Sequence, residues 1–320
     1  MVKFTAKLAA TAGLLYLIAR GIDFAQIATL TRTSDAALVA WAVLATVALN
    51  AVKPLRWMWL LRCVLERVGY LVALRSHLFA AGARMILPGK LGEFGRILAV
   101  PRLSISAGTG LTVMDLLMDM ATACLLAAPG MWFFAGPLPG VAVAVVAGLC
   151  LLTLLRPHAA LAAVTRLPGL RRLAARADVL SRVPRHLDGG VLARGLTVSL
   201  ILHALRFVQL YILLGAVGAS PQLMALLCLP MIQLADGVAI TFGGIGGREW
   251  LGMHILPRYG VTAEMAVAAI FLQFAISNLL PGLAGAWIIA RDRHSAAAKL
   301  RGLLSGGQHS TVEYSPPQSG

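Results

Sequence analysis

Apolar segments long enough to cross a lipid bilayer dominate this chain of 320 residues. Hydrophobic residues make up 59% of it and charged residues only 13%, whereas soluble domains are about half apolar and about a quarter charged. A spanning helix needs roughly 20 predominantly apolar residues, and the helix satisfies its own backbone polar groups inside the bilayer. The sequence therefore predicts an all-α fold, a polytopic transmembrane helix bundle.

The basic residues follow the apolar segments. There are 28 Lys and Arg against 13 Asp and Glu, for a net charge of +15. Such an excess can indicate a nucleic-acid partner, but here the positive charges cluster between apolar segments and near the C-terminus. That distribution indicates membrane topology through the positive-inside rule. We expect a multi-pass protein of the inner cell membrane with both termini in the cytoplasm and no nucleic-acid partner.

The apolar pattern predicts one integral membrane domain over residues 1–301 and a disordered tail over residues 302–320, which are rich in Ser, Gly, Pro and Gln. A basic cytoplasmic loop, residues 156–190, divides the domain into halves of about 1–155 and 191–290. The expected segments are residues 8–22, 36–52, 104–134, 138–155, 191–217, 223–240 and 263–290, with a shorter charged segment at 71–87. Lys53 and Arg56 are expected at the cytoplasmic end of the second segment, with Trp57 as an interfacial anchor.

Three full spans after residue 190 would be one too many, because an even number of crossings must connect two cytoplasmic regions. One of these segments is therefore expected to be re-entrant, or residues 250–256 complete a further short span.

Two glycine-rich stretches with charged residues interrupt the apolar pattern, one in each half: LPGKLGEFGRI at residues 87–97 and FGGIGGREW at residues 242–250. Glycine adopts backbone conformations closed to other residues, and charges at membrane depth are costly unless paired or hydrated. The stretches predict two re-entrant or broken helices beside a polar cavity, approached from opposite sides. Such an inverted repeat is typical of the central site of a transporter. The alternative is that each stretch is only a tight turn between helices.

Five charged residues of these stretches are candidate substrate-binding residues. Lys90, Arg96 and Arg248 lie beside glycine-rich backbone and could bind an anion such as a phospholipid or prenyl-phosphate headgroup. Glu93 and Glu249 have two interpretations. Each could stabilise the first turn of a restarting helix through the helix dipole, or each could take part in binding or proton coupling.

A second group of polar residues lies inside apolar segments. Asp115 and Asp119 are spaced i, i+4 and share one helix face. Each carboxylate would cost roughly 2.5 to 3.5 kcal/mol at membrane depth on an insertion scale, so both should face the bundle or water. We expect Arg206 or Arg248 to pair with this face. The alternative is that one aspartate reaches the membrane interface.

In the second half, His203, Arg206 and Gln209 are spaced by three residues and form a polar stripe on one helix. Asp236 is expected to cap the helix that breaks near FGGIGG. His203, Arg206 and Asp236, together with the two aspartates of the first half, are the candidates for intramembrane polar pairing.

The sequence offers no other chemistry. The four cysteines, far apart and without a CxxC pair, are interpreted as packing residues. There is no HExxH motif and no Walker motif, so we expect neither a metal nor a nucleotide cofactor. No catalytic set of nucleophile, base and oxyanion donors follows from the spacing.

Four motifs, taken in order, resemble the membrane region of lysylphosphatidylglycerol synthases and its stand-alone flippase-like relatives. They are KPLRWMWLLR at residues 53–62, LPGKLGEFGRI, GTGLTVMDLLMDM at residues 108–120 and ITFGGIGGREW at residues 240–250. The resemblance covers most of residues 36–290. Its most specific part is GGIGGRE, which is similar to the family's Gly-Gly-x-Gly-x-Arg-Glu signature. The chain departs from the family before Asp119, where Met114 and Asp115 stand in place of a frequent Glu-Arg pair, so a role for that arginine is in doubt.

The resemblance implies a membrane domain that moves or presents lipids, with Lys90, Glu93, Arg96, Arg248 and Glu249 at matched positions. In family members that transfer an aminoacyl group, the chemistry resides in a soluble domain after the membrane region. We expect that domain to be absent, because the chain ends about 30 residues after its last segment.

Three functions remain open at this point. The favoured one is passive or ion-coupled translocation of an amphipathic, anionic lipid. The alternatives are an enzyme acting on a lipid-linked substrate, with Glu93 or Glu249 as acid or base, and a scaffold that presents lipid to a lipid-biosynthesis enzyme. Membrane lipids are the expected partners in each case.

Overall fold

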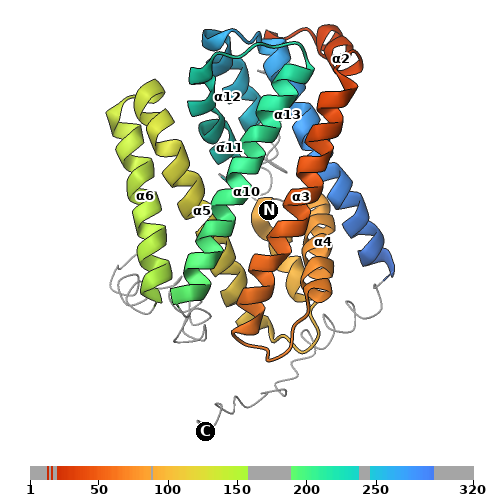
Figure 1. Cartoon of the computed structure of the whole chain (residues 1–320), viewed down its shortest axis with the longest axis vertical. Coiled ribbons are helices and arrows are strands. Elements are labelled where there is room, and N and C mark those ends of the chain that lie inside the picture. Colours follow the sequence, from red (N-terminus) through yellow and green to blue (C-terminus); the bar gives the residue numbers. More distant parts are fainter. Residues whose placement is uncertain are drawn as a thin grey trace.

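A computed structural model of the protein describes residues 13, 16, 20–87, 89–157, 189–237 and 246–291 (Figure 1). All regular secondary structure in these ranges is helical. In chain order the helices are α2 (Phe24–Arg32), α3 (Ala36–Arg62), α4 (Tyr70–Ile86), the 3-10 helix η1 (Gly89–Ile97), α5 (Ile105–Ala135), α6 (Pro137–Leu155), α10 (Gly189–Ala216), η2 (Leu223–Leu227), α11 (Leu229–Gly237), α12 (Gly247–Ile255), η4 (Leu256–Tyr259), α13 (Ala263–Phe274) and the π-helical turn η5 (Ala275–Leu279).

Five helices of the described part are long and apolar enough to cross a membrane: α3, α5, α6, α10 and the continuous helix Ala263–Arg291, which contains α13 and η5. The predicted segments 104–134, 138–155, 191–217 and 263–290 coincide with four of them to within a few residues. The all-α, polytopic fold is therefore confirmed. The predicted first helix falls mainly outside the described residues, as do residues 158–188 of the basic loop and the whole C-terminal tail.

Local sequence signals explain where the long helices begin. Asp35 precedes α3, and its carboxylate accepts hydrogen bonds from the backbone N–H groups of Ala37 and Leu38 at 2.8 and 3.2 Å. Ser104 precedes α5, and its hydroxyl accepts from the N–H of Ala107 at 3.2 Å. These side chains satisfy N–H groups that have no partner within the helix.

The second helix is longer than the sequence predicted. It continues beyond residue 52, through Pro54, to Arg62. Lys53 and Arg56 are therefore not at a cytoplasmic end but inside the helix, and the Arg56 side chain is fully buried. Trp57 is also buried, so it is not an interfacial anchor. Acidic partners on other helices explain the difference, because they neutralise basic residues that would otherwise be excluded from the protein interior.

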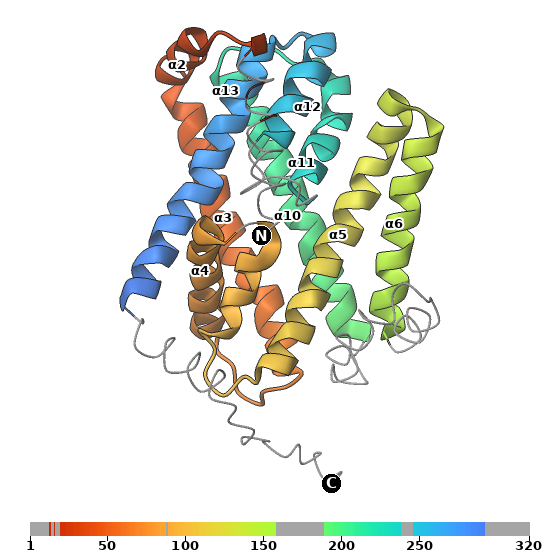
Figure 2. The ribbon, with the colours of Figure 1, turned by 180° about the vertical axis from the view of Figure 1, so that it is seen from behind.

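The first half contains a hairpin that enters from the lower end of the bundle (Figures 1 and 2). Helix α3 descends through the bundle, α4 rises to about mid-height, and η1 returns toward the lower end before α5 rises through the whole bundle. Gly92 lies against the backbone of Arg84 so closely that a Cβ would overlap it. This contact holds η1 against α4 and confirms that residues 71–97 form a re-entrant hairpin.

The second half contains a similar helical hairpin in the inverted orientation. Helix α10 rises, α11 descends from the upper end to about mid-height, α12 returns to the upper end, and α13 descends (Figures 1 and 2). Since α11 and α12 enter and leave at the same end, α10 and α13 are the two crossings of this half. The number of crossings after residue 190 is therefore even, because α11 and α12 form a re-entrant pair. Residues 250–256 do not complete a span. The two hairpins have opposite orientations, as expected of an inverted repeat.

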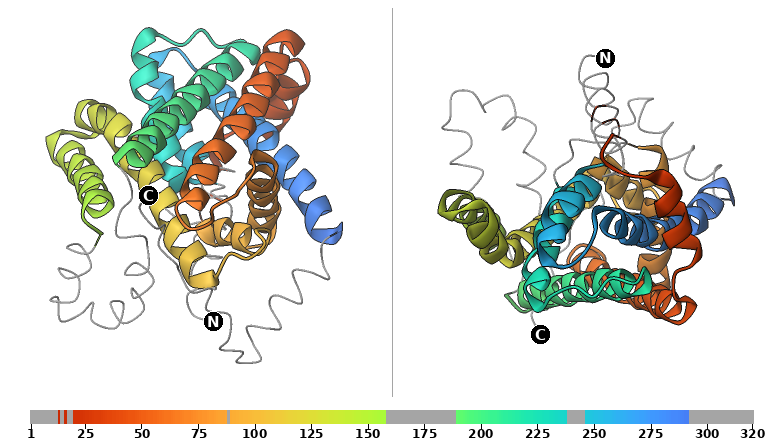
Figure 3. Two further views of the ribbon diagram at one scale, coloured as in Figure 1. Left: turned by 60° about the horizontal axis from the view of Figure 1, so that its bottom comes forward. Right: turned by 90° about the horizontal axis from the view of Figure 1, so that it is seen from above.

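Two apolar cores fill the interior of the described part. One lies in the upper half among α10, α11, α12 and α13, with Leu210, Ile232 and Ile270 fully buried. The other lies in the lower half among α3, η1 and α5, with Leu60 and Leu111 fully buried. Helix α6 packs against α5 at the periphery, as the view from above shows (Figure 3, right).

Candidate functional site

A layer of polar side chains separates the two apolar cores. Along α3 it comprises Thr46, Asn50 and Lys53, which lie between core residues Ala42 and Trp57. Along α10, Ser199, His203 and Arg206 likewise lie between the core residues Leu192 and Leu210. The layer therefore crosses the long helices near their middles. In a bilayer, polar groups at this depth are costly unless they are paired or hydrated, and they mark substrate and ion pathways.

Arg56 is the centre of the buried part of this layer. Its Nε donates to Asp115 Oδ1 at 2.6 Å, and its Nη1 donates to Asp119 Oδ1 at 2.5 Å and to the Ser199 hydroxyl. One guanidinium on α3 thus joins α5 and α10. The predicted pairing of the aspartates with Arg206 or Arg248 is wrong, because Arg56 binds both carboxylates. The i, i+4 spacing did identify the two carboxylates that share the cation.

Arg96 and Glu93 extend the network into the first hairpin. Arg96 donates to Asp115 Oδ2 at 2.7 Å, to the backbone carbonyl of Glu93 at 3.0 Å and to the Glu93 carboxylate. Its guanidinium also lies over the Trp57 ring, 4.7 Å from the centroid. The Glu93 carboxylate accepts a further hydrogen bond from Arg84 and lies 3.5 Å from Lys53 Nζ. Glu93 therefore serves as a shared counterion and not as a first-turn acid of a restarting helix.

The second hairpin uses its charges differently. Gly246 has φ +100°, a left-handed conformation that favours glycine, and α12 begins immediately after it. The Glu249 carboxylate accepts from the Gly246 N–H at 2.7 Å, which confirms its predicted position in the first turn. Arg248 is buried, with its guanidinium 5.9 Å from the centroid of the Phe274 ring. Residues 242–245 and the side chain of Asp236 lie outside the described part, so the predicted cap by Asp236 stays a prediction.

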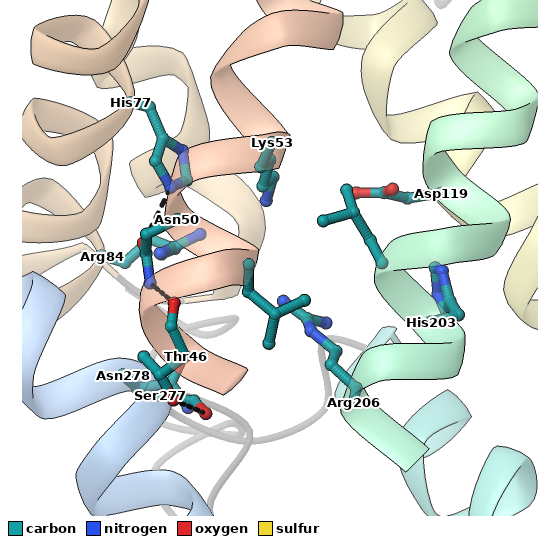
Figure 4. Close-up of a pocket in the computed structure, with 12 residues that line it drawn as sticks. Thr46, Asn50, Lys53, His77, Arg84, Asp119, His203, Arg206, Ser277 and Asn278 are labelled. Carbon is teal, nitrogen blue, oxygen red and sulfur yellow. Dashed lines mark hydrogen bonds between the residues drawn. The ribbon is translucent and has the colours of Figure 1, made fainter. Parts of the chain in front are cut away.

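Two adjoining cavities open within the polar layer. The first, about 40 Å³, is lined mainly by polar side chains of α3, α4, α5, α10 and η5 (Figure 4). It is large enough for a few water molecules. Lys53, Arg206 and Asp119 surround a common space in this view, and His77 Nε2 lies 3.1 Å from Asn50 Oδ1 at its edge. A buried space of this kind can hydrate or bind a charged group at mid-membrane depth.

The second cavity, about 180 Å³, lies among η1, α5, α10 and α11. Lys90, Asp119, His203, Arg206 and Gln233 form its polar lining, and the remaining lining is apolar. Because Asp119, His203 and Arg206 line both cavities, these three side chains separate the two spaces. The structure thus brings Lys90, Asp119, His203 and Arg206 together around the cavities, whereas Arg248 and Glu249 are not among the described lining residues.

A chain of glutamine side chains supports the cavities from the upper side. Gln209 donates to Thr46 Oγ1 at 2.6 Å and accepts from Ser277 Oγ at 2.9 Å, and Gln233 donates to Gln273 Oε1 at 2.6 Å. Gln273 in turn donates to the backbone carbonyl of Arg206 at 3.0 Å. These bonds connect α3, α10, α11 and α13 next to the π-helical turn. An isolated Gln in an apolar helix indicates such a hydrogen bond, but of these glutamines only Gln209 was predicted to belong to a polar stripe.

Sequence reasoning missed three more residues of the layer. The sequence predicts a cytoplasmic flank for Lys53 and Arg56, and it indicates no site role for Arg84. Their spacing gave one available signal, since Lys53 and Arg56 are three residues apart and share a helix face with one another.

No group of three or more His, Cys, Asp or Glu side chains in the described ranges could hold a metal ion.

Comparisons with known proteins agree with the motifs. The family model described as the lysylphosphatidylglycerol synthase TM region matches residues 4–285. No curated protein matches the chain. The matched range contains both hairpins, the ion network and all five long helices except the last few residues of the helix Ala263–Arg291. The chain therefore belongs to the family of the lysylphosphatidylglycerol synthase membrane region, and it is an integral membrane protein related to lipid handling.

Proposed function

We propose that the protein translocates an amphipathic, anionic lipid across the membrane, with the headgroup passing through the two adjoining cavities and the hydrocarbon chains remaining in the bilayer. The observation that carries this proposal is the position of the cavities. They lie midway along the long helices, between two hairpins that enter from opposite ends, as in transporters whose binding site lies at the bilayer midplane.

The charges around the cavities favour a negative headgroup. Lys53 and Arg84 line the first cavity, Lys90 lines the second, and Arg206 lines both. Among the described lining residues, the one carboxylate belongs to Asp119, which is held by Arg56. Of the residues predicted to bind substrate, we propose that Lys90 contacts the headgroup. Glu93 and Arg96 position the first hairpin, and Arg248 and Glu249 shape the second.

The enzyme alternative has less support. Its proposed acids or bases were Glu93 and Glu249, but Glu93 accepts from three cations and Glu249 accepts from a backbone N–H group at the start of α12. A general base needs an accessible lone pair beside the reacting proton. These contacts occupy the two carboxylates with structural roles.

We also propose that the lower end of the bundle in Figure 1 faces the cytoplasm of a cell whose inner membrane holds the protein. Arg62, Arg156 and Arg291 lie at the lower ends of their helices. Helices α6 and α10, which flank the basic segment 156–190 in the sequence, end and begin on this side. By the positive-inside rule, this end is cytoplasmic.

Reconstitution in phosphatidylcholine vesicles tests the proposed translocation. Trace amounts of chain-labelled fluorescent phosphatidic acid or phosphatidylglycerol are placed in both leaflets, and dithionite quenches the label in the outer leaflet. The intact protein should let quenching proceed beyond half of the label, and mass spectrometry should find the lipid unmodified. Arg206→Ala should slow the quenching of label that starts in the inner leaflet. Arg258→Ala, a change at an exposed arginine away from the cavities, should leave this rate unchanged. Quenching that stops at half for both lipids with folded protein present contradicts translocation, and a covalently changed lipid favours the enzyme.

A further inference from the structure

Two of the cations at the cavities make no salt bridge to an acidic side chain among the described residues. The other cations of the layer are paired: Arg56 with Asp115 and Asp119, and Lys53, Arg84 and Arg96 with Glu93. No ion pair or side-chain hydrogen bond within the described ranges involves Lys90 or the Arg206 guanidinium. Both side chains line the 180 Å³ cavity, Lys90 from the first hairpin and Arg206 from α10.

Unpaired cations at membrane depth are unfavourable, because a low dielectric and a lack of water destabilise the charged form. A protein that keeps two of them at one cavity gains from a ligand that brings the missing negative charge. Among the described side chains, the cluster has six cations and three carboxylates, which leaves three positive charges in excess; the side chain of Asp236 lies outside this count. The cations are Lys53, Arg56, Arg84, Lys90, Arg96 and Arg206, and the carboxylates are those of Glu93, Asp115 and Asp119.

From this excess we infer that the cavity selects a lipid with a terminal phosphate monoester, held between Lys90 and Arg206, and rejects a lipid with a cationic aminoacyl headgroup. The inference rests on the proposed function and names its substrate class. A phosphate monoester has close to two negative charges at neutral pH and three terminal oxygens. Arg206 can bind two of these oxygens at once, while Lys90 acts as a point charge on the third.

The rest of the cavity supports a compact headgroup. Leu116, Met120 and Ala123 of α5 and Leu234 of α11 form its apolar lining. These side chains cannot bind the hydroxyl groups of a glycerol or sugar attached to the phosphate, but they can contact the first carbons of a hydrocarbon chain. The amide of Gln233 already donates to Gln273. Apolar side chains thus form one side of the lining, which favours a phosphate followed directly by apolar carbon or ester groups.

The same lining gives a cationic headgroup no counterion. An ammonium group would need a carboxylate, and Asp119 provides the one carboxylate in the described lining. Asp119 already accepts from Arg56 at 2.5 Å. A lysyl-bearing headgroup would add positive charge to a cavity that already has an excess. This prediction separates the chain from a transporter of aminoacylated lipid by charge alone.

Equilibrium binding to the purified full chain in a nonionic detergent tests the inference, with short-chain lipids titrated and tryptophan fluorescence or calorimetry as the readout. The matched probes are dihexanoyl phosphatidic acid, its methyl diester and dihexanoyl lysylphosphatidylglycerol. Because a hydrogen bond to a charged group contributes about 1.5 to 3 kcal/mol, loss of one such contact weakens binding about tenfold or more. The monoester should bind at least about tenfold more tightly than the methyl diester, and the lysyl lipid should bind most weakly.

Variants locate the site. Lys90→Ala and Arg206→Ala should each weaken phosphatidic acid binding about tenfold or more and reduce the preference over the diester, and Arg206→Lys should recover part of the loss. Arg258→Ala is the matched control and should bind as the unmodified chain does. Thermal melting of each variant excludes loss of fold as the cause. Equal affinity for monoester and diester, or unchanged binding in both alanine variants, would overturn the inference.

Further probes distinguish the source of the phosphate. Farnesyl phosphate that binds more tightly than phosphatidic acid supports a polyprenyl monophosphate, the reverse order supports a glycerolipid, and inorganic phosphate that binds as tightly as either lipid overturns the lipid assignment. The two proposals can fail separately. Selective binding of the monoester without movement of lipid in vesicles contradicts the proposed translocation but supports the proposed phosphate site. Movement of all lipids at the same rate, with no binding preference, supports the proposed translocation but contradicts the proposed selectivity for a phosphate monoester.

Discussion

Replacement of Arg56 by Met should be among the most destabilising single substitutions in this protein. The guanidinium is fully buried and donates to Asp115, Asp119 and Ser199 on two other helices. Breaking a buried ion pair from one side costs about 3 to 5 kcal/mol, because the remaining charge is left uncompensated. In the variant Asp115 keeps Arg96 at 2.7 Å, whereas Asp119 keeps no ion pair among the described residues.

The size of the stability loss depends on Asp119, which loses its ion pair in the variant. Its side chain is 25% exposed toward the cavities, so water can compensate part of the loss. We therefore expect the lower end of the range, about 3 kcal/mol, which is roughly a 150-fold change in the folding equilibrium. The double variant Arg56→Met with Asp119→Asn should recover part of this loss, because the amide removes the unpaired charge. The expected coupling between the two positions is about 1 to 2 kcal/mol.

Equilibrium unfolding in mixed micelles of SDS and a nonionic detergent, followed by circular dichroism, measures these free energies. Arg67→Met is the control, since Arg67 is exposed in the connection between α3 and α4. It should change the free energy of unfolding by less than about 0.5 kcal/mol. The reasoning is refuted if Arg56→Met is as stable as this control, or if the effects of Arg56→Met and Asp119→Asn simply add.

Three other substitutions test the helix contacts that surround the cavities. Gly285→Ala should lower the free energy of unfolding by about 1 to 3 kcal/mol in the same assay, because the added methyl group overlaps backbone atoms of α4; Gly148→Ala, at a position with open space, should not lower it. Glu249→Ala should cost about 1 kcal/mol because the N–H of Gly246 loses its acceptor, while Glu249→Gln should recover most of the loss; equal stability of the two variants contradicts the capping role. Gln209→Leu should cost about 1 to 2 kcal/mol by removing the hydrogen bonds between α3, α10 and η5, and an unchanged thermal unfolding temperature would show that these bonds are not needed.

Much of the bundle follows from local sequence. Apolar length predicted α5, α6, α10 and the last long helix to within a few residues, because a bilayer allows few other structures for such segments. The glycine-rich stretch after residue 86 predicted a re-entrant hairpin, and the close contact of Gly92 with Arg84 is the reason that glycine is needed there. Glu249 was placed correctly because a first-turn acid is a local feature.

Only the tertiary structure decided which charges meet. From sequence alone, Lys53 and Arg56 have the spacing and neighbours of a cytoplasmic flank, and nothing local indicates that Arg56 will contact Asp115, 59 residues later. Ion pairing over that separation depends on how α3, α5 and α10 pack, and packing sums many weak contacts that no single segment encodes. The same packing leaves Lys90 and Arg206 at one cavity whose one carboxylate among the described lining residues, that of Asp119, is held by Arg56. The sequence thus determined a basic helical bundle of membrane-spanning segments, and the fold determined which of its cations form ion pairs and which line the cavities without one among the described residues.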